Sequence, residues 1–183
     1  RYMYETDGTA SGTQVATGFG FTQVNNLYEN TAVLSSTLYL NFQDGANTTD
    51  FAVFSYDGTT LTDLNVEARG GVATDGTDLF AGIRDGITSN YPLATSTDGG
   101  TNWLSVCSTD STTTHTWSGI ASDIAAVDEK CIFASAQDAA NSDLELWVYD
   151  TVNSSCNYFD VNSDTAVDSL PRIFTKFGSD YYF

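Results

Sequence analysis

The chain has 183 residues, which is enough for one or two small domains with a buried core. Its 24 acidic residues outnumber the 6 basic ones and give a formal net charge of −18. No basic stripe could neutralise phosphates, so we expect no nucleic-acid partner, and the lack of a run of about 18 apolar residues predicts no membrane insertion.

The composition favours strands and turns over helices. Thr, Ser, Gly, Asp and aromatic residues are abundant, whereas Lys, Glu, Arg and Met are few. We therefore expect an all-β fold.

The chain opens with RYMYETDGTASGTQVAT, which predicts two strands around a turn at Asp7 and Gly8. Three longer units follow, each with four short apolar segments separated by turns. The second unit, 27–68, contains NTAVLS, TLYLNFQ, DFAVFSY and TLTDLNVE; the third, 69–117, contains GGVAT, DLFAGIR, YPLATST and NWLSVCS; the fourth, 118–168, contains GIASDIAAV, KCIFASA, LELWVYD and CNYFDVN. The chain closes with LPRIFTKFGSDYYF, which predicts two more strands.

The three longer units share one spacing. In each, an aromatic residue is followed five positions later by Asp, and a turn-forming Asp follows 12 or 13 positions after that. The pairs are Tyr39 and Asp44, Phe80 and Asp85, and Phe133 and Asp138, with the turn residues Asp57, Asp98 and Asp150. A register that holds three times predicts an internal repeat.

Two strands, three sets of four and two more strands predict a single β-propeller domain over residues 1–183, with four four-stranded blades. One blade is expected to be completed by both ends, because residues 1–26 and 169–183 each supply half of it. The strand edges at the two ends are expected to pair within the chain or with a neighbouring copy, since an unpaired edge is a template for another strand. Those edges carry Tyr2, Tyr4, Tyr181 and Tyr182. Pairing between copies would make a homo-oligomer, as rings or filaments.

The segment STDGGTNW resembles the Asp-box, a β-hairpin turn of sialidase-like and other propellers. Four of the five defining positions match, and Asn102 stands where the family has Thr. The matching residues are Ser96, Asp98, Gly100 and Trp103. The resemblance implies a structural turn in which Asp accepts hydrogen bonds, Gly adopts a positive φ and Trp packs between blades. Asx-turn chemistry independently favours that role.

The segment YMYETDGTASGT is similar to the E-L-W-x-x-D-G-T-x-x-G-T repeat of secreted bacterial proteins. LELWVYD and FAVFSYDGTT keep parts of the pattern, although Thr151 stands where the repeat has Gly. The matching turn residues are Asp7, Gly8, Asp57, Gly58 and Asp150. The resemblance implies an extracellular or cell-surface module and no defined chemistry.

Enzymatic chemistry finds little support in the sequence. A sialidase needs an arginine cluster, and the arginines fall at different positions of the repeat: Arg1, Arg69, Arg84 and Arg172. The only histidine, His115, lies in a polar stretch that predicts a solvated loop without a nucleophile motif. Paired acids could serve glycoside hydrolysis, but 24 acids leave the pairing unconstrained. We therefore expect a non-enzymatic extracellular structural or binding module, with a glycan-binding or sialidase-like glycoside-hydrolase propeller as the alternative.

Small partners are a separate expectation. Two loops each bring two carboxylates together, which makes Ca²⁺ the expected cation if a metal binds, with plain solvated turns as the alternative. These pairs are Asp44 with Asp50 and Asp75 with Asp78. Trp117 is the aromatic residue that we expect to be most open to ligand binding, with glycans or other surface proteins as partners.

The three cysteines, Cys107, Cys131 and Cys156, lack metal-ligand spacing, so one disulfide and one free thiol are expected with the pairing left open. Asn47 and Asn153 lie in N-x-S/T sequons, which are glycosylation sites only in a secreting eukaryote. The start of the chain shows no signal-peptide pattern, so we expect a processed or excised chain.

Overall fold

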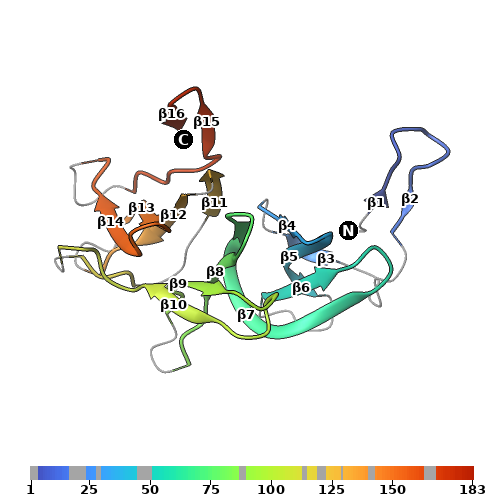
Figure 1. Ribbon diagram of the computed structural model, residues 1–183, viewed down its shortest axis with the longest axis horizontal. Coiled ribbons are helices and arrows are strands. Elements are labelled where there is room, and N and C mark those ends of the chain that lie inside the picture. Colours follow the sequence, from blue (N-terminus) through green and yellow to red (C-terminus); the bar gives the residue numbers. More distant parts are fainter. Residues whose placement is uncertain are drawn as a thin grey trace.

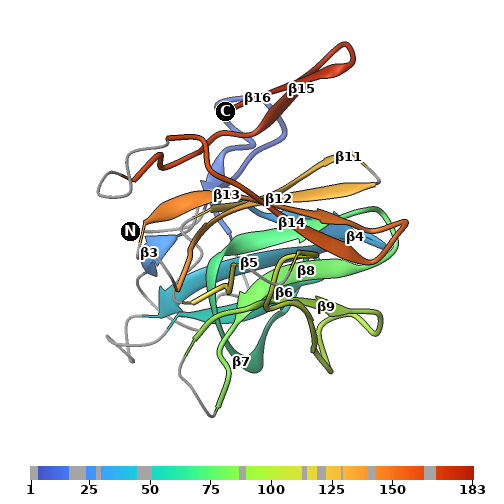
Figure 2. The same cartoon turned by 90° about the vertical axis from the view of Figure 1, so that its left-hand side faces the viewer.

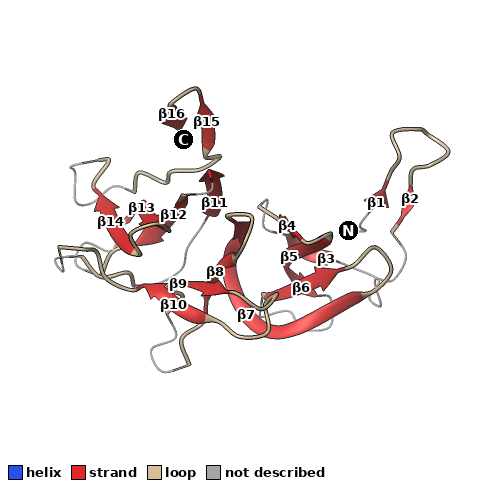
Figure 3. Ribbon diagram, in the orientation of Figure 1, coloured by secondary structure: helices blue, strands red, loops and turns tan. Residues whose placement is uncertain are grey.

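The structure is a computed structural model that describes residues 4–16, 24–27, 30–44, 51–86, 90–112, 115–118, 123–128, 130–139, 143–162 and 168–183. Within these residues the regular structure consists of strands, which confirms the expected all-β class (Figure 3). The described part of the chain contains no helix that could cross a membrane.

The described residues form sixteen strands in four sheets, which contain two, eight, four and two strands in chain order (Figure 1). The strands are β1 (Tyr4–Glu5), β2 (Gln14–Val15), β3 (Val24–Leu27), β4 (Ala32–Leu34), β5 (Thr37–Asp44), β6 (Ala52–Tyr56), β7 (Leu61–Thr74), β8 (Leu79–Ile83), β9 (Leu93–Ser96), β10 (Leu104–Cys107), β11 (Asp123–Asp128), β12 (Cys131–Gln137), β13 (Leu144–Asp150), β14 (Ser155–Phe159), β15 (Thr175–Phe177) and β16 (Asp180–Tyr182).

The eight-stranded sheet is built around β7, which is 14 residues long and curves through the molecule (Figure 1). Its first half pairs with β6 and its second half pairs with β8. At the junction, Gly70 and Gly71 adopt φ angles of 84° and 91°, and the register with β8 shifts. Glycine adopts such angles without strain, so the strand bends without ending. The predicted second and third units, 27–68 and 69–117, are therefore joined in one sheet instead of forming two.

Strands β11 to β14 form a separate antiparallel sheet inside the predicted fourth unit, 118–168. β11 lies beside β7, so the four-stranded and eight-stranded sheets meet along these two strands. In Figure 2 the β11–β14 sheet crosses above the eight-stranded sheet.

The two ends of the chain form separate two-stranded sheets, β1–β2 and β15–β16. β15 lies beside β11, while β1–β2 projects on the other side of the molecule (Figure 1). The prediction that the two ends complete one four-stranded sheet within the chain is therefore wrong for this structure. Among the described residues, neither hairpin pairs with a further strand.

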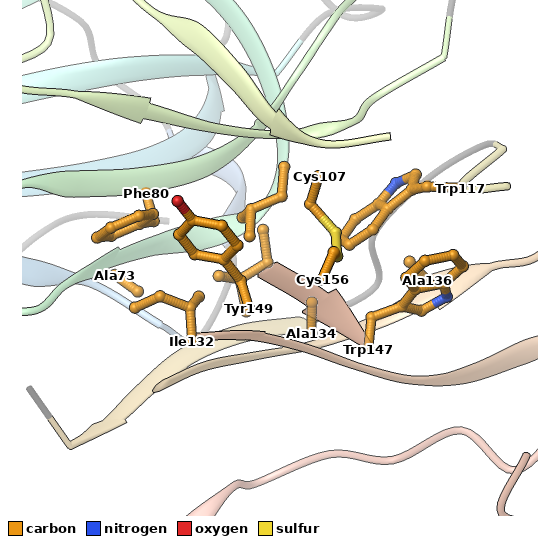
Figure 4. Packing of buried hydrophobic residues seen from close by; sticks show 12 residues of the cluster. Ala73, Phe80, Cys107, Trp117, Ile132, Ala134, Ala136, Trp147, Tyr149 and Cys156 are labelled. Atoms are coloured by element: carbon orange, nitrogen blue, oxygen red, sulfur yellow. A yellow bond between two sulfur atoms is a disulfide. The ribbon is translucent and has the colours of Figure 1, made fainter. Parts of the chain in front are cut away.

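The largest hydrophobic cluster fills the space between the four-stranded sheet and the second half of the eight-stranded sheet (Figure 4). Its buried members are Ala73, Phe80, Leu93, Cys107, Trp117, Ile124, Ile132, Ala134, Ala136, Trp147, Tyr149 and Cys156. A disulfide between Cys107 of β10 and Cys156 of β14 crosses this core and joins the last strands of the two sheets. It selects one of the pairings that the sequence leaves open.

Candidate functional site

Strands from different units meet around a hollow of about 310 Å³, which we call the hub cavity. It is lined by β4, the second half of β7, β11 and the residue before β15. The lining residues are Asn30, Thr31, Ala32, Val33, Val72, Ala73, Thr74, Ile124, Ala125, Ala126 and Phe174. Their side chains are mainly small alkyl groups, with two hydroxyls, one amide and one phenyl ring, so the walls offer shape and a few hydrogen bonds.

Asp123 joins three segments at the rim of the hub cavity. Its Oδ1 accepts a hydrogen bond from Asn30 Nδ2, and its Oδ2 accepts one from the backbone N–H of Ile173 at 3.1 Å. The carbonyl oxygen of Asn30 in turn accepts a hydrogen bond from the backbone N–H of Val72 at 3.1 Å. One carboxylate therefore links β11 to the segment before β4 and to the segment before β15.

The hairpin β15–β16, the C-terminal hairpin, is anchored on the β11–β14 sheet through aromatic side chains. Phe133 of β12 stacks on Phe174 with ring centroids 5.7 Å apart, and the centroid of the Tyr181 ring lies 5.0 Å from that of Phe133. Phe183 reaches Phe174 at 6.1 Å. Such pairs contribute about 0.5–1.5 kcal/mol each beyond the area they bury. The hairpin thereby covers Phe133, which is buried.

Asp128, the last residue of β11, receives the polar contacts of the C-terminal hairpin. The Tyr181 hydroxyl donates a hydrogen bond to Asp128 Oδ2, and Lys176 Nζ lies 3.1 Å from the same oxygen. The hydrogen bond from Tyr181, aided by the backbone N–H of Lys130 and by Lys176, lowers the pKa of Asp128 from 3.8 to about 2. The contact with Asp128 also raises the pKa of Tyr181 and of Lys176. The carboxylate thus stays ionised well into acid pH.

The hairpin β1–β2, the N-terminal hairpin, makes its hydrogen bonds locally. Tyr4 lies opposite Val15, and Gln14 Nε2 donates a hydrogen bond to Glu5 Oε1 at 2.6 Å. In the turn, Asp7 Oδ1 accepts hydrogen bonds from both the backbone and the side chain of Thr9. The hydrogen bonds of its described residues stay within the hairpin, in contrast to those of the C-terminal hairpin.

The predicted edge tyrosines have different surroundings. Tyr4 and Tyr182 are exposed, at 62% and 54%. Tyr181 is half-buried against Phe133, and Tyr2 lies outside the described residues. Beside Tyr182, the exposed aromatic side chains of the C-terminal segment include Phe177 and Phe183.

The Asp98 turn connects β9 and β10 and has a dense set of local hydrogen bonds. Asp98 Oδ1 accepts a hydrogen bond from the backbone N–H of Asn102 at 2.9 Å and one from Ser96 Oγ at 2.8 Å. Trp103 Nε1 donates to the carbonyl oxygen of Gly100, whose φ is 89°. The Asn102 backbone and side chain, with Ser96, lower the pKa of Asp98 from 3.8 to about 2. These groups are occupied in shaping the turn.

Three other predicted turn acids, Asp7, Asp57 and Asp150, use their carboxylates alike. Oδ1 of each accepts the backbone N–H two residues further on, at 2.8–2.9 Å. Hydrogen bonds from turn residues lower the pKa of all three. Gly8 and Gly58 follow their acids with φ angles of 90° and 94°, so these two turns share both sequence and geometry.

The acids proposed for Ca²⁺ are only partly described. Asp75 Oδ1 accepts the backbone N–H groups of Thr77 and Asp78, as in an Asx-turn. Burial and the charge of Asp75 raise the pKa of Asp78. The side chain of Asp44 and all of Asp50 lie outside the described residues. Within the described part, His, Cys, Asp and Glu form no group of three that could hold a metal, and Ca²⁺ remains a prediction.

Two sequence expectations around residue 115 need correction. Trp117 is 2% exposed and packs against Trp147, with ring centroids 5.4 Å apart, so it is a core residue and not an open binding residue (Figure 4). His115 is not a solvated loop residue: Nδ1 lies 2.9 Å from Oδ2 of the buried Asp138, and the ring stacks on Tyr158 at 3.8 Å. The residues that contact Trp117 and His115 lie 20 or more positions away in the sequence, so local sequence patterns did not reveal these contacts.

The sequence did not indicate that Arg69 and Arg84 belong to one cluster around Glu67 and Tyr91. Arg84 Nη1 lies 2.5 Å from Glu67 Oε2, and the Tyr91 hydroxyl donates a hydrogen bond to the same carboxylate. The Arg69 guanidinium lies over the Tyr91 ring at 5.2 Å. Burial, followed by the hydrogen bond to Glu67, raises the pKa of Tyr91, which is 5% exposed. The cluster is closed to solvent at Tyr91 and supports the bend in β7.

The remaining modification candidates are a thiol and two sequons. Cys131 is a free, half-buried cysteine, and burial raises the pKa of its thiol. Asn153 is exposed, and its amide donates a hydrogen bond to Asp150 Oδ2 at 2.7 Å. Asn47 lies outside the described residues.

Compared with known proteins, the chain matches no family model, no curated protein and no solved structure. The features of the chain that bear on function are therefore the geometry of the hub cavity and of the two terminal hairpins.

Proposed function

We propose that this chain is a non-enzymatic, extracellular structural module of the β-propeller kind, which assembles through its two terminal hairpins. The observation that carries the proposal is that the two ends are separate two-stranded sheets. Together they have as many strands as the β11–β14 sheet, and both present exposed aromatic side chains.

The arrangement around the hub cavity supports a propeller. β4, the second half of β7 and β11 are the expected first strands of successive units, and all three line the cavity. Phe174, which directly precedes β15 in the segment expected to supply the first strand of the split unit, closes the series. The last strands β10 and β14 lie away from the cavity and are joined by the Cys107–Cys156 disulfide. Blades of a propeller are ordered in this way, from a central strand to a peripheral one.

The chemistry of the candidate sites supports a structural role. Alkyl groups dominate the hub cavity, and the Asp123 carboxylate at its rim already accepts two hydrogen bonds. The imidazole of His115 is engaged by Asp138 and Tyr158. A disulfide is typical of oxidising environments, which favours an extracellular location.

Light scattering over a range of protein concentrations tests assembly directly. Moderate salt is needed, because a net charge of −18 makes copies repel one another at low ionic strength. We expect the mean mass to rise with concentration, and Tyr4→Lys to suppress the rise by placing a charge on the β1 edge. A monomer mass at every concentration contradicts the proposed assembly. Hydrolysis of model glycosides by the protein would contradict the proposal that it is not an enzyme.

Glycan binding is the second candidate function. It is favoured by a surface hollow of about 360 Å³ whose lining includes Trp103, Arg84, Asp85 and Ser105. An aromatic ring beside hydrogen-bonding groups is the usual chemistry of sites that fix a small polar ligand. A glycan array tests it: a hit that is lost in Ser105→Trp, which fills the hollow, supports the site, and an array without hits removes it.

A further inference from the structure

We propose that β16 of one copy pairs with β1 of a second copy in one antiparallel register, with Asp7 opposite Asp180, Glu5 opposite Tyr182 and Tyr4 opposite Phe183. This inference rests on the proposed function, because it names the partner and the contact through which the module assembles. Nothing in the register requires a third component.

The register follows from the second and fourth units, in which the second and third strands are paired and the turn acid lies at the end of the third strand or directly after it. In the fourth unit the turn acid Asp150 lies opposite Cys131, the first residue of β12. In the second unit Leu38 lies opposite Tyr56, so one position further along the turn acid Asp57 falls opposite Thr37, the first residue of β5. Both units therefore place the turn acid against the first residue of the second strand.

The second unit is a close template for the terminal hairpins because its turn is the same. Asp7-Gly8-Thr9 and Asp57-Gly58-Thr59 share their sequence, and in both the Asp Oδ1 accepts the backbone and side-chain donors of the Thr. The third unit has the longer Ser96–Asn102 turn, in which Ser96 itself lies opposite Leu79, the first residue of β8. Since β16 begins at Asp180, the second-unit rule places Asp7 opposite Asp180.

This register puts matching side chains on matching faces. Residues two apart on a strand share a face, so Phe183 and Tyr181 point the same way, toward Phe133 and Phe174. Tyr4, directly opposite Phe183, would join that aromatic group from the second copy. Tyr4 and Phe183 are 62% and 52% exposed in the single chain, so both lose exposed apolar surface on pairing.

The partner is a second copy because the two hairpins of one chain are held apart. The C-terminal hairpin is fixed to β11 and β12 through Asp128 and Phe133. The N-terminal hairpin lies across the molecule from it (Figure 1). Two segments that are separated in one projection are at least that far apart in space, so β1 presents its edge to another molecule. A contact between unlike ends repeats from copy to copy and yields a chain or a ring.

Cysteine cross-linking tests the register and the partner together. In a Cys131→Ser background, Tyr4→Cys and Phe183→Cys are made as two separate proteins, mixed in equal amounts and oxidised mildly. We expect a disulfide-linked heterodimer to form at least tenfold faster than either homodimer. The matched control is Glu5→Cys mixed with Phe183→Cys, which places the thiols on opposite faces and is expected to react at least tenfold more slowly. Both substituted aromatic side chains are exposed, and unchanged melting of each variant verifies the fold.

The double variant Tyr4→Cys/Phe183→Cys separates the remaining possibilities. A ladder of linked copies supports the proposal, whereas a linked species of monomer mass overturns pairing in trans while leaving the propeller arrangement intact. No cross-link, combined with mass growth in light scattering, overturns this register but not assembly itself. A constant monomer mass without cross-linking overturns both the register and the proposed function.

Discussion

The N-terminal hairpin and the C-terminal hairpin are both two-stranded antiparallel sheets, but their surroundings differ. The C-terminal hairpin covers Phe133 and binds Asp128 through Tyr181 and Lys176. The N-terminal hairpin is held by hydrogen bonds among its own residues and exposes Tyr4. The described residues of the C-terminal hairpin are therefore part of the folded body, whereas those of the N-terminal hairpin form their hydrogen bonds with one another. The following changes test that division.

Reduction of the Cys107–Cys156 disulfide is expected to have the largest effect. The bond closes a segment with a sequence separation of 49, and loop closure of that length stabilises a fold by about 4 kcal/mol. It braces the sheet on which the C-terminal hairpin lies, so reduction should loosen that hairpin and leave the N-terminal one unchanged. Urea titration of Cys107→Ser/Cys156→Ser, followed by hydrogen exchange of each hairpin, measures both effects. Equal loss of protection in both hairpins would remove the distinction between them.

Phe133→Ala is expected to have the next largest effect. The ring is buried beneath Phe174 and Tyr181, and removing a buried phenyl ring costs about 3 kcal/mol or more. In a chain of this size that lowers Tm by roughly 6–12 °C. Calorimetry measures the shift, with the exposed Tyr4→Ala as the matched control that leaves Tm nearly unchanged. A similar loss in both variants would mean that the N-terminal hairpin is also part of the folded body.

Tyr181→Phe is expected to have a smaller effect that depends on pH. It removes the main hydrogen bond that lowers the pKa of Asp128 to about 2. Since this pKa is below the ordinary value of 3.8, the carboxylate stabilises the hairpin above about pH 4, and the stabilisation is lost as pH falls through 2. The free energies of unfolding of the two proteins, from urea titration, should therefore differ by about 1 kcal/mol at pH 7 and converge as pH falls below about 2. A difference of the same size at the lowest pH would assign the effect to packing instead.

Asp7→Ala is expected to have the smallest effect on global stability. Its carboxylate holds only its own turn, so Tm should not change measurably while amide exchange in residues 4–16 accelerates. Asp57→Ala, which removes the same contact from a turn between two strands of the large sheet, is the comparison. If Asp7→Ala lowers Tm as much as Asp57→Ala, the N-terminal hairpin is coupled to the core.

The sequence predicted what short-range chemistry determines. The all-β class follows from composition, and the turns at Asp57 and Asp98 follow from Asx-turn and glycine requirements that act within a few residues. It failed where the outcome depends on distant partners. Trp117 is buried because Trp147 lies beside it, and no local pattern around Trp117 carries that information.

Strand continuity was also beyond sequence analysis. The Gly70–Gly71 pair is typical of a turn between two units. Glycine tolerates the positive φ angles at this position, however, and β7 continues through the bend. The disulfide pairing could not be obtained from spacing. Cys131 lies almost midway in sequence between Cys107 and Cys156, so the two shorter pairings would close loops of nearly the same length. In each case the fold decides between local alternatives of similar cost.

The unbroken course of β7 determines where the molecule would come apart under load. Because one strand serves two meanders, the two halves of the eight-stranded sheet can be separated from each other only by breaking backbone pairing along β7. The junction with the β11–β14 layer consists of side-chain packing, a few hydrogen bonds such as that from Asn30 to Asp123, and the Cys107–Cys156 bond. In an oxidising exterior that covalent link closes the weaker seam, and in a reducing interior the same seam becomes the line of first separation.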